Sequence, residues 1–339
     1  MDKAILFAFL ILFPFGQIIK IGFINPIDVI VGVGALWAII KKYKFTKYFK
    51  DFLIVAAFSY LLSVSIYKSP QVTTGLLYLI RLTAYFYFYI FVSHFKNKKL
   101  LFNSLLSLSL FSALFGWFQY FIYPDLTSLK YLGWDDHLFR LAGTFLDPGF
   151  TCLIIVFGAI LSFAKKKYFL LTFFATTLAF TYSRAGYLAF AASLLFAAFL
   201  FRRYKILVLS LVYFLAVILF LPTPAGEGVN LGRTYSISSR IINYKETLEI
   251  FKKSPVFGVG FNNICLYKKS SSSHSCSGSD SSLLLILATT GIVGFIIFAV
   301  SVLKILSNLK KGFYAKTFLG YSLGCFCSQS FCKQPLLPM

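Results

Sequence analysis

The chain has 339 residues, of which 58% are hydrophobic and only 13% are charged, and its formal net charge is +22 at pH 7. A soluble domain carries roughly a quarter charged residues, so this composition and the mean hydropathy of +0.79 exclude an ordinary soluble protein. The basic residues fall in short clumps between apolar segments rather than on one continuous face. Nucleic-acid binding is therefore excluded as the meaning of the positive charge.

Eleven apolar segments follow one another along the chain, and most have the length that a helix needs to cross a ~30 Å hydrocarbon core. They cover residues 4–19, 24–40, 52–67, 75–94, 100–122, 147–164, 168–182, 186–201, 206–221, 281–303 and 313–331. The pattern predicts an all-α protein, a polytopic transmembrane helical bundle with about 11 (10–12) spanning helices. We expect residues 1–339 to form a single integral membrane domain.

Clumps of Lys and Arg follow every second apolar segment. They comprise Lys41, Lys42, Lys44, Lys47 and Lys50, then Lys96, Lys98 and Lys99, then Lys165 to Lys167, then Arg202, Arg203 and Lys205, then Lys304, Lys310, Lys311 and Lys316. Because cytoplasmic loops carry an excess of basic residues, the clumps predict that these loops and the N-terminus face the cytoplasm. The polar segment 222–280 is then one long extracytoplasmic loop.

Four arginines on the predicted outer side stand out at or near helix ends, and none of them belongs to these clumps: Arg81, Arg140, Arg184 and Arg240. A long basic side chain can reach the lipid headgroups, and this alternative applies most to Arg81 and less to Arg140. Arg184 stands in TYSRAG and is the one charged residue in the range 168–201. A tight turn between helices requires Ser and Gly but no Arg. Since a guanidinium matches phosphate oxygens geometrically, these arginines are candidate anion ligands.

Within the long loop, residues 240–253 predict an amphipathic helix that lies at the outer membrane surface. Its apolar face consists of Ile241, Tyr244, Leu248 and Phe251. Arg240 at its start lies beside free backbone N–H groups, which favour an anion. The segment PVFGVGFNN, residues 255–263, predicts a tight turn through its glycines. A nucleotide-binding loop is disfavoured because the strand and helix that flank such loops are missing.

A Ser-rich run, SSSSHSCSGSDSS, holds His274 and Asp280 just before the next apolar segment. A low-complexity linker is the alternative explanation of this run, and Asp280 or Ser281 can cap the following helix. Cys265 and Cys276 lie in the same loop and can form a disulfide if the outer side is oxidising.

Four segments, taken in order, resemble the motifs of the bacterial O-antigen ligase and O-antigen polymerase family: RLAGTFLDPG, TYSRAG, SSRIINYKETLEIFKKSPVFGVGFNN and LLLILATTGIVGF. The motifs cover about residues 138–300. The resemblance implies a multi-pass glycosyltransferase of the bacterial inner (cytoplasmic) membrane, active on its outer face. Such an enzyme transfers a glycan from undecaprenyl diphosphate to an acceptor hydroxyl in lipopolysaccharide or surface polysaccharide assembly. The acceptor is lipid A core for a ligase and another lipid-linked repeat for a polymerase, and both remain open.

By matching motif, the resemblance implies Arg184 and Arg240 as ligands of the substrate diphosphate and Arg140 as a third. The family's functional His falls at Asp280 in this register, so the acid–base residue is Asp280 or His274. No metal or cofactor is expected, because an arginine cluster can stabilise the diphosphate by itself. The expected partners are the lipid-linked glycan donor, a glycan or lipid A core acceptor, and membrane lipids. A lipid-linked oligosaccharide transporter is the rival class, disfavoured because the candidate residues collect on the outer side.

Overall fold

The computed structural model describes residues 1–16, 18–19, 25–66, 70–132, 136–224, 226–268, 278–307 and 312–327, and over these residues the chain is helical, without a strand. The α-helices are α1 (Asp2–Leu12), α2 (Pro26–Ile40), α3 (Lys47–Ile66), α4 (Pro70–Ser93), α5 (Lys98–Ile122), α6 (Pro148–Ala164), α7 (Tyr168–Ala179), α8 (Arg184–Phe201), α9 (Tyr204–Leu219), α10 (Tyr235–Lys253), α11 (Ser282–Ser307) and α12 (Phe313–Cys327). Each of the eleven predicted apolar segments coincides with one of these helices, and α10 lies within the loop 222–280.

Five of the described helices are long and apolar enough to cross a membrane, namely α3, α4, α5, α8 and α11. Four others, α2, α6, α7 and α9, are apolar but shorter. The all-helical fold is confirmed over the described residues and is compatible with a helical membrane protein, while the number of eleven spans stays a prediction.

Helix starts follow local capping rules. Asn25 accepts a hydrogen bond from the Ile27 backbone N–H and precedes Pro26 at the first position of α2. Asp147 likewise caps α6 in front of Pro148, and Ser183 caps α8. Such caps satisfy backbone donors that the helix itself leaves without partners, so the loop residues fix where each helix begins.

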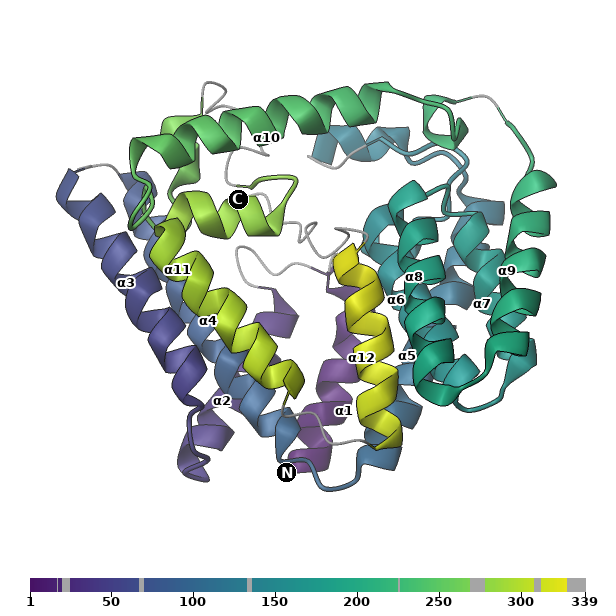
Figure 1. Cartoon of the computed structure of the whole chain (residues 1–339), viewed down its shortest axis with the longest axis horizontal. Helices are drawn as coiled ribbons and strands as arrows, with labels where there is room; N and C mark the ends of the chain where they lie inside the picture. The colour runs from purple at the N-terminus through teal and green to yellow at the C-terminus, as the bar shows by residue number, and fades with distance from the viewer. Residues whose placement is uncertain are drawn as a thin grey trace.

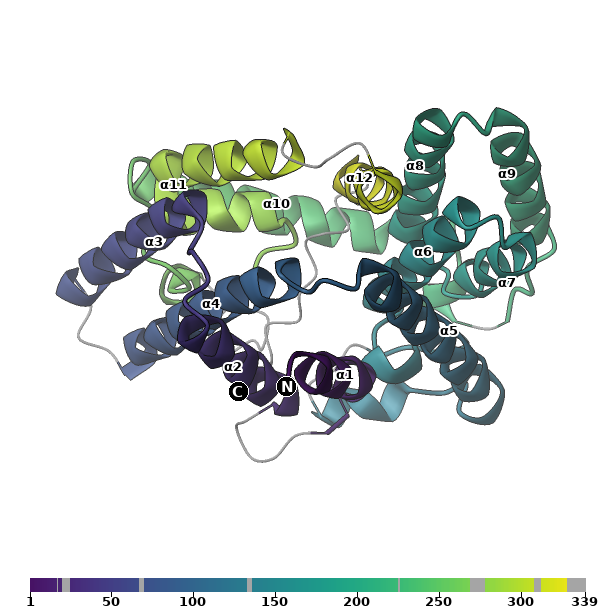
Figure 2. The same ribbon diagram turned by 90° about the horizontal axis from the view of Figure 1, so that it is seen from below.

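The helices form two groups that are visible side by side in Figure 1. In one group α4 packs against α2 and α3, and α11 packs against α3; in the other, α5 to α9 and α12 pack around α6 and α8. Helix α1 contacts both α2 and α5 and so lies between the groups, as Figure 2 shows from below. Helix α10 lies across one end of both groups and packs against α11 (Figure 1).

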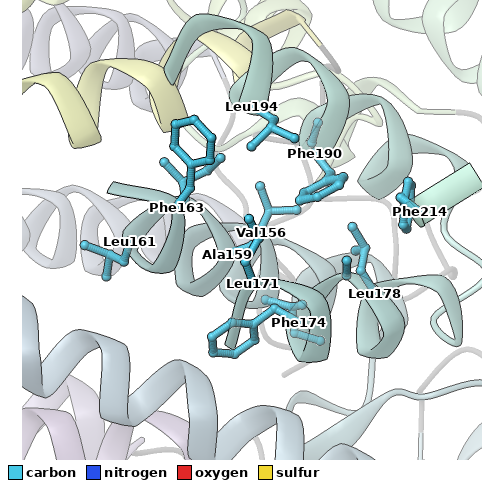
Figure 3. Packing of buried hydrophobic residues seen from close by; sticks show 14 of the residues in the cluster. Val156, Ala159, Leu161, Phe163, Leu171, Phe174, Leu178, Phe190, Leu194 and Phe214 are labelled. Carbon is cyan, nitrogen blue, oxygen red and sulfur yellow. The ribbon is translucent and has the colours of Figure 1, made fainter. Parts of the chain in front are cut away.

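The largest core cluster lies within the second group, where α6 is surrounded by its neighbours (Figure 3). Phe163 from α6, Phe174 from α7 and Phe190 from α8 are all fully buried. Small residues allow close approach at the margin of this group: a Cβ added to Gly320 of α12 would lie 3.2 Å from Ala197 of α8. In a membrane, close packing of this kind holds helices together, because lipid tails are as apolar as the side chains.

Within the described residues, which leave out Lys310 and Lys311, the five basic clumps lie at one end of the bundle, and side-chain contacts link each clump to another. Tyr43 stacks on His94 at 4.1 Å, and Lys165 hydrogen-bonds Asn103 near the start of α5. Further contacts of this kind join Arg203 to the Phe163 and Ala164 carbonyls, Lys304 to Tyr48, and Phe201 to Phe313. Helix α10 crosses the opposite end (Figure 1). The segregation agrees with the predicted sidedness, and which end faces the cytoplasm stays a prediction.

Candidate functional site

Arg140 belongs to a buried segment that a single glutamine holds in place. Gln119, at the end of α5, donates to the Arg140 carbonyl at 3.4 Å. Its Oε1 accepts from the backbone N–H groups of Ala142 (2.9 Å) and Gly143 (3.1 Å). The Arg140 side chain then crosses to the turn before α8, where Nε donates to the Thr181 carbonyl at 3.1 Å. The sequence indicated Arg140 by its motif alone. In the structure, this arginine is anchored at both its backbone and its guanidinium.

Arg184 is the first residue of α8 and follows the Ser183 cap. Its Nη1 donates to the carbonyls of Leu231 at 3.1 Å and Arg233 at 2.8 Å. The first turn of α8 lies close to α6, because a Cβ on Gly186 would approach the Cys152 sulfur to 2.6 Å. The TYSRAG turn therefore positions Arg184 against the loop that leads to α10.

Arg233 is a site residue that the sequence reasoning missed. Its Nη1 donates to the carbonyls of Gly228 (2.6 Å) and Asn230 (2.9 Å), and its Nη2 to the Tyr182 carbonyl at 3.2 Å. The sequence could have indicated Arg233, because it is an arginine in the predicted outer loop that belongs to no cytoplasmic clump. The same criterion selected Arg184.

The three anchored arginines meet at the backbone of Tyr182. The Tyr182 carbonyl accepts from Arg233 and, at 3.5 Å, from Arg140 Nη2, while Arg184 binds the Arg233 carbonyl. Tyr182 is buried, its hydroxyl donates to the Pro222 carbonyl, and its φ is +49°. A left-handed backbone is uncommon for a residue other than Gly and concentrates at functional sites.

Like charges act on one another in this cluster. Burial, and then the charge of Arg233, lower the pKa of the Arg140 guanidinium to about 10, so it remains cationic at neutral pH. Burial, and then the charges of Arg184 and Arg240, lower the pKa of Arg233. The carboxylates of Asp147 and Glu227 act in the opposite direction on Arg140 and Arg233, respectively. The cluster thus combines three arginines with two carboxylates that offset only part of its positive charge.

Arg240 lies in the second turn of α10, which begins at Tyr235 and not at the predicted Arg240. Its side chain is exposed, and no described residue forms a hydrogen bond or ion pair with it. The predicted apolar face of this helix is wrong in part, since Ile241 and Leu248 are 47% and 39% exposed. The face that packs on the bundle carries Thr247 and Ile250 instead. Tertiary packing has overridden the hydrophobic pattern here, because the bundle offers polar groups at this end.

Asp280 lies just before α11, and Ser281 rather than Asp280 caps this helix, accepting from the Leu284 N–H at 3.3 Å. The Asp280 backbone N–H donates to Asn243 Oδ1 on α10 at 2.9 Å. Its side chain is therefore released from a capping role. His274 and Cys276 lie outside the described residues, and Cys265 is disulfide-bonded.

The two glycine motifs of the family resemblance pack against each other. Helix α11 is broken at Gly291, where φ is 68° and ψ is −171°. The turn at 255–260 fills the break: Val259 N–H donates to the Ala288 carbonyl at 2.9 Å, and Ile292 N–H donates to the Pro255 carbonyl at 2.9 Å. The tight turn predicted from the glycines is confirmed, and it supports a broken helix.

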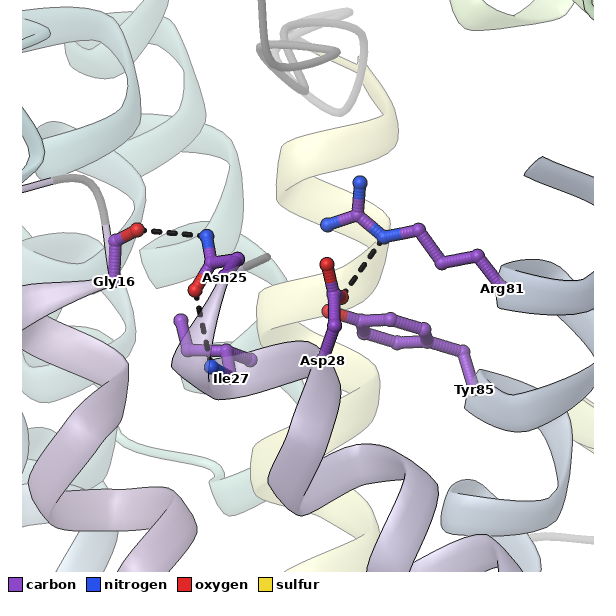
Figure 4. A network of polar contacts seen from close by, with 6 residues as sticks. All are labelled: Gly16, Asn25, Ile27, Asp28, Arg81 and Tyr85. Carbon is purple, nitrogen blue, oxygen red and sulfur yellow. Dashed lines mark hydrogen bonds and ion pairs between the residues drawn. The ribbon is translucent and has the colours of Figure 1, made fainter. Parts of the chain in front are cut away.

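Arg81 was predicted to lie at or near a helix end. It lies instead near the middle of α4. Its Nε lies 2.9 Å from Asp28 Oδ1 of α2, and the Tyr85 hydroxyl donates to the same oxygen at 3.1 Å (Figure 4). The headgroup explanation for Arg81 is therefore wrong, because a carboxylate on the neighbouring helix pairs with it within the bundle.

Residues 168–299 match the family model described as O-antigen ligase, while neither the curated proteins nor the solved structures gave a match. The matched stretch runs from the start of α7 into α11 and holds Arg184, Arg233, Arg240 and Asp280. Family members are glycosyltransferase-like ligases or polymerases, and the apolar helices fit a bacterial membrane protein. Over residues 168–299, this chain is therefore similar to the O-antigen ligase family.

Proposed function

We propose that the protein transfers a glycan from undecaprenyl diphosphate to an acceptor hydroxyl at the outer face of the inner membrane. The observation that carries the proposal is the arginine cluster around the Tyr182 carbonyl, at the end of the bundle opposite the basic turns. Two lipid-linked phosphates bring several anionic oxygens to one place. Guanidinium groups match those oxygens geometrically and retain their charge at every physiological pH.

The reaction is a direct displacement at the anomeric carbon. The acceptor hydroxyl oxygen forms a bond to that carbon, and the bond from carbon to the phosphate oxygen breaks, with its electron pair moving to the oxygen. The hydroxyl proton passes to the Asp280 carboxylate, and undecaprenyl diphosphate leaves with the added negative charge. Arg184, Arg233 and Arg240 stabilise that charge as it develops, with Arg140 supporting the cluster. His274 is the alternative proton acceptor.

A transporter of lipid-linked oligosaccharide is the second candidate, and the Asp28–Arg81 pair within the helices is the observation that favours it. Asp28 pairs directly with Arg81, however, whereas Asp147 and Glu227 offset the charge of the outer arginine cluster only in part. Transfer is therefore the function that the site supports better. The two functions separate in liposomes, since a transporter moves the lipid-linked glycan between leaflets without any acceptor.

Replacing Arg184 or Arg240 by Lys tests the diphosphate site. Lys keeps the charge but loses the planar fork, so we expect glycan transfer to fall at least about tenfold, which corresponds to about 1.4 kcal/mol. The assay uses purified protein, a lipid-diphosphate-linked glycan, and either lipid A core or a second lipid-linked repeat as acceptor. The acceptor that is consumed distinguishes a ligase from a polymerase.

The matched control is Arg202→Lys, because Arg202 is an exposed arginine in the turn between α8 and α9 at the basic end. This variant should transfer glycan at the wild-type rate. Wild-type rates for both Arg184→Lys and Arg240→Lys would contradict the proposed function.

A further inference from the structure

One face of α10 runs toward the segment that precedes α11. At helical spacing it carries Arg240, Asn243, Thr247 and Ile250. Thr247 is fully buried and Ile250 is 2% exposed. Asn243 therefore lies one turn from Arg240, between that exposed arginine and the buried residues Thr247 and Ile250.

Asn243 binds the Asp280 segment through two hydrogen bonds to one oxygen. Its Oδ1 accepts from the Asp280 backbone N–H at 2.9 Å and from Ser279 Oγ at 3.1 Å. Ser279 Oγ also lies 3.0 Å from Thr247 Oγ1. Both Ser279 and Thr247 are buried, so the contacts are shielded from water and fix the backbone of Asp280 against α10.

Lys268 approaches the same segment from the other side. It is only 7% exposed, and its Nζ donates to the Gly278 carbonyl at 2.5 Å. Burial lowers the pKa of the Lys268 ammonium, while the charges of Glu246 on α10 and of Asp280 act in the opposite direction. The buried Lys268 side chain thus holds the backbone two residues before Asp280 through the Gly278 carbonyl.

We propose that Asn243 and Lys268 are positioning residues for Asp280: Asn243 fixes its backbone N–H against α10, and Lys268 fixes the Gly278 carbonyl two residues before it. This inference rests on the proposed function. Asn243 and Arg240 are three residues apart on α10, a rise of ~4.5 Å along the helix. The proposed proton acceptor is therefore anchored within one turn of a proposed diphosphate ligand.

Two kinetic consequences follow from acting through Asp280. Asn243→Ala should lower kcat at least about tenfold while KM for the donor is kept, because the arginines are untouched. Lys268→Met should likewise lower kcat while KM for the donor is kept, because the backbone before Asp280 loses its hydrogen bond at the Gly278 carbonyl. Lys268→Arg keeps a donor at this position and should retain more activity than Lys268→Met.

The experiment compares these variants with Asp280→Asn and with two controls on the exposed face of α10. Glu249 and Lys252 pair with each other at 2.7 Å and are both largely exposed, so Glu249→Gln and Lys252→Met should leave kcat unchanged. Thermal unfolding in detergent establishes that each variant is folded. Asn243→Asp, which keeps an acceptor oxygen at this position, should retain more activity than Asn243→Ala.

The outcomes separate this inference from the proposed function. If Asp280→Asn is inactive while Asn243→Ala and Lys268→Met match the wild type in kcat, the positioning roles are refuted and the transfer function stands. A loss of activity in Lys268→Met that appears in KM for the donor rather than in kcat also refutes the role of Lys268, because it indicates a defect in the donor site. If Asp280→Asn transfers glycan at the wild-type rate, the assigned proton acceptor and the positioning residues fall together.

Discussion

Replacement of Gly291 by Ala should disrupt the fold, because α11 is broken at this residue and the turn 255–260 fills the break. The backbone at Gly291, with φ of 68° and ψ of −171°, belongs to a region that is almost restricted to Gly. A Cβ at this position would lie 2.1 Å from the Val256 carbonyl oxygen and 2.6 Å from the Phe257 nitrogen. These are backbone atoms, so no side-chain rotation can relieve the overlap.

The expected cost combines two effects. Holding a residue with a Cβ in this conformation costs about 1–3 kcal/mol. Separating the two segments also breaks the backbone hydrogen bonds of Val259, Gly260, Ile292 and Val293 across the break, each worth about 0.5–1.5 kcal/mol. The total is about 3–9 kcal/mol, which is comparable with the whole stability of a typical domain, about 5–15 kcal/mol.

Thermal unfolding of the purified protein in detergent measures the effect, together with the yield of monodisperse protein. Gly32→Ala is the matched control, since Gly32 lies inside α2 and a Cβ there would meet nothing within 4 Å. Ala is favoured over Gly in a helix by ~1 kcal/mol, so the control should unfold at the same or a slightly higher temperature. An unchanged unfolding temperature for Gly291→Ala would refute the account of the broken helix.

Two further predictions concern the backbone that holds Arg140 and the sidedness of the bundle. Gln119→Leu leaves the N–H groups of Ala142 and Gly143 without their acceptor, so we expect a loss of about 2–4 kcal/mol of stability and weaker donor binding. Thermal unfolding and lipid-diphosphate titrations that match the wild type would contradict this expectation. In a cysteine-free background, the single cysteine of Asn230→Cys should react with a membrane-impermeant thiol reagent only from outside. The single cysteine of Lys166→Cys should react only from the cytoplasmic side. Labelling of Asn230→Cys from the cytoplasmic side would remove the basis for an outer active site.

Helix positions were predictable because apolar segments in a membrane protein have few alternatives to a helix. The counts of Lys and Arg predict the sidedness of the loops, and contacts such as Tyr43–His94 and Lys304–Tyr48 bring the basic turns to one end. The number of membrane crossings follows less directly from the sequence than the helix positions do. Helices α1 and α2 are shorter than their apolar segments, and composition does not determine how a short helix is embedded in the membrane.

Contacts between distant segments were not predictable in the same way. Asp28 and Arg81 are separated by a whole helix in the sequence, so their pairing depends on how α2 packs on α4. Arg233 was missed because its role arises from the Tyr182 carbonyl, and carbonyl positions leave no trace in residue types. The buried face of α10 was misassigned for a related reason: Asn243 and Thr247 find polar partners that only the folded chain provides.

The contrast between Arg81 and the outer arginines separates a structural charge from a ligand-binding one. Asp28 pairs with Arg81 and neutralises it, which is what a partly buried cation between helices requires. Carbonyl groups orient the guanidinium groups of Arg140 and Arg233, and the carboxylates of Asp147 and Glu227 offset their charge only in part. A bound diphosphate relieves the repulsion among the clustered arginines while gaining charge-assisted hydrogen bonds. The same arrangement makes the cluster most favourable when the phosphate charge is greatest, which is after the bond to the anomeric carbon has broken.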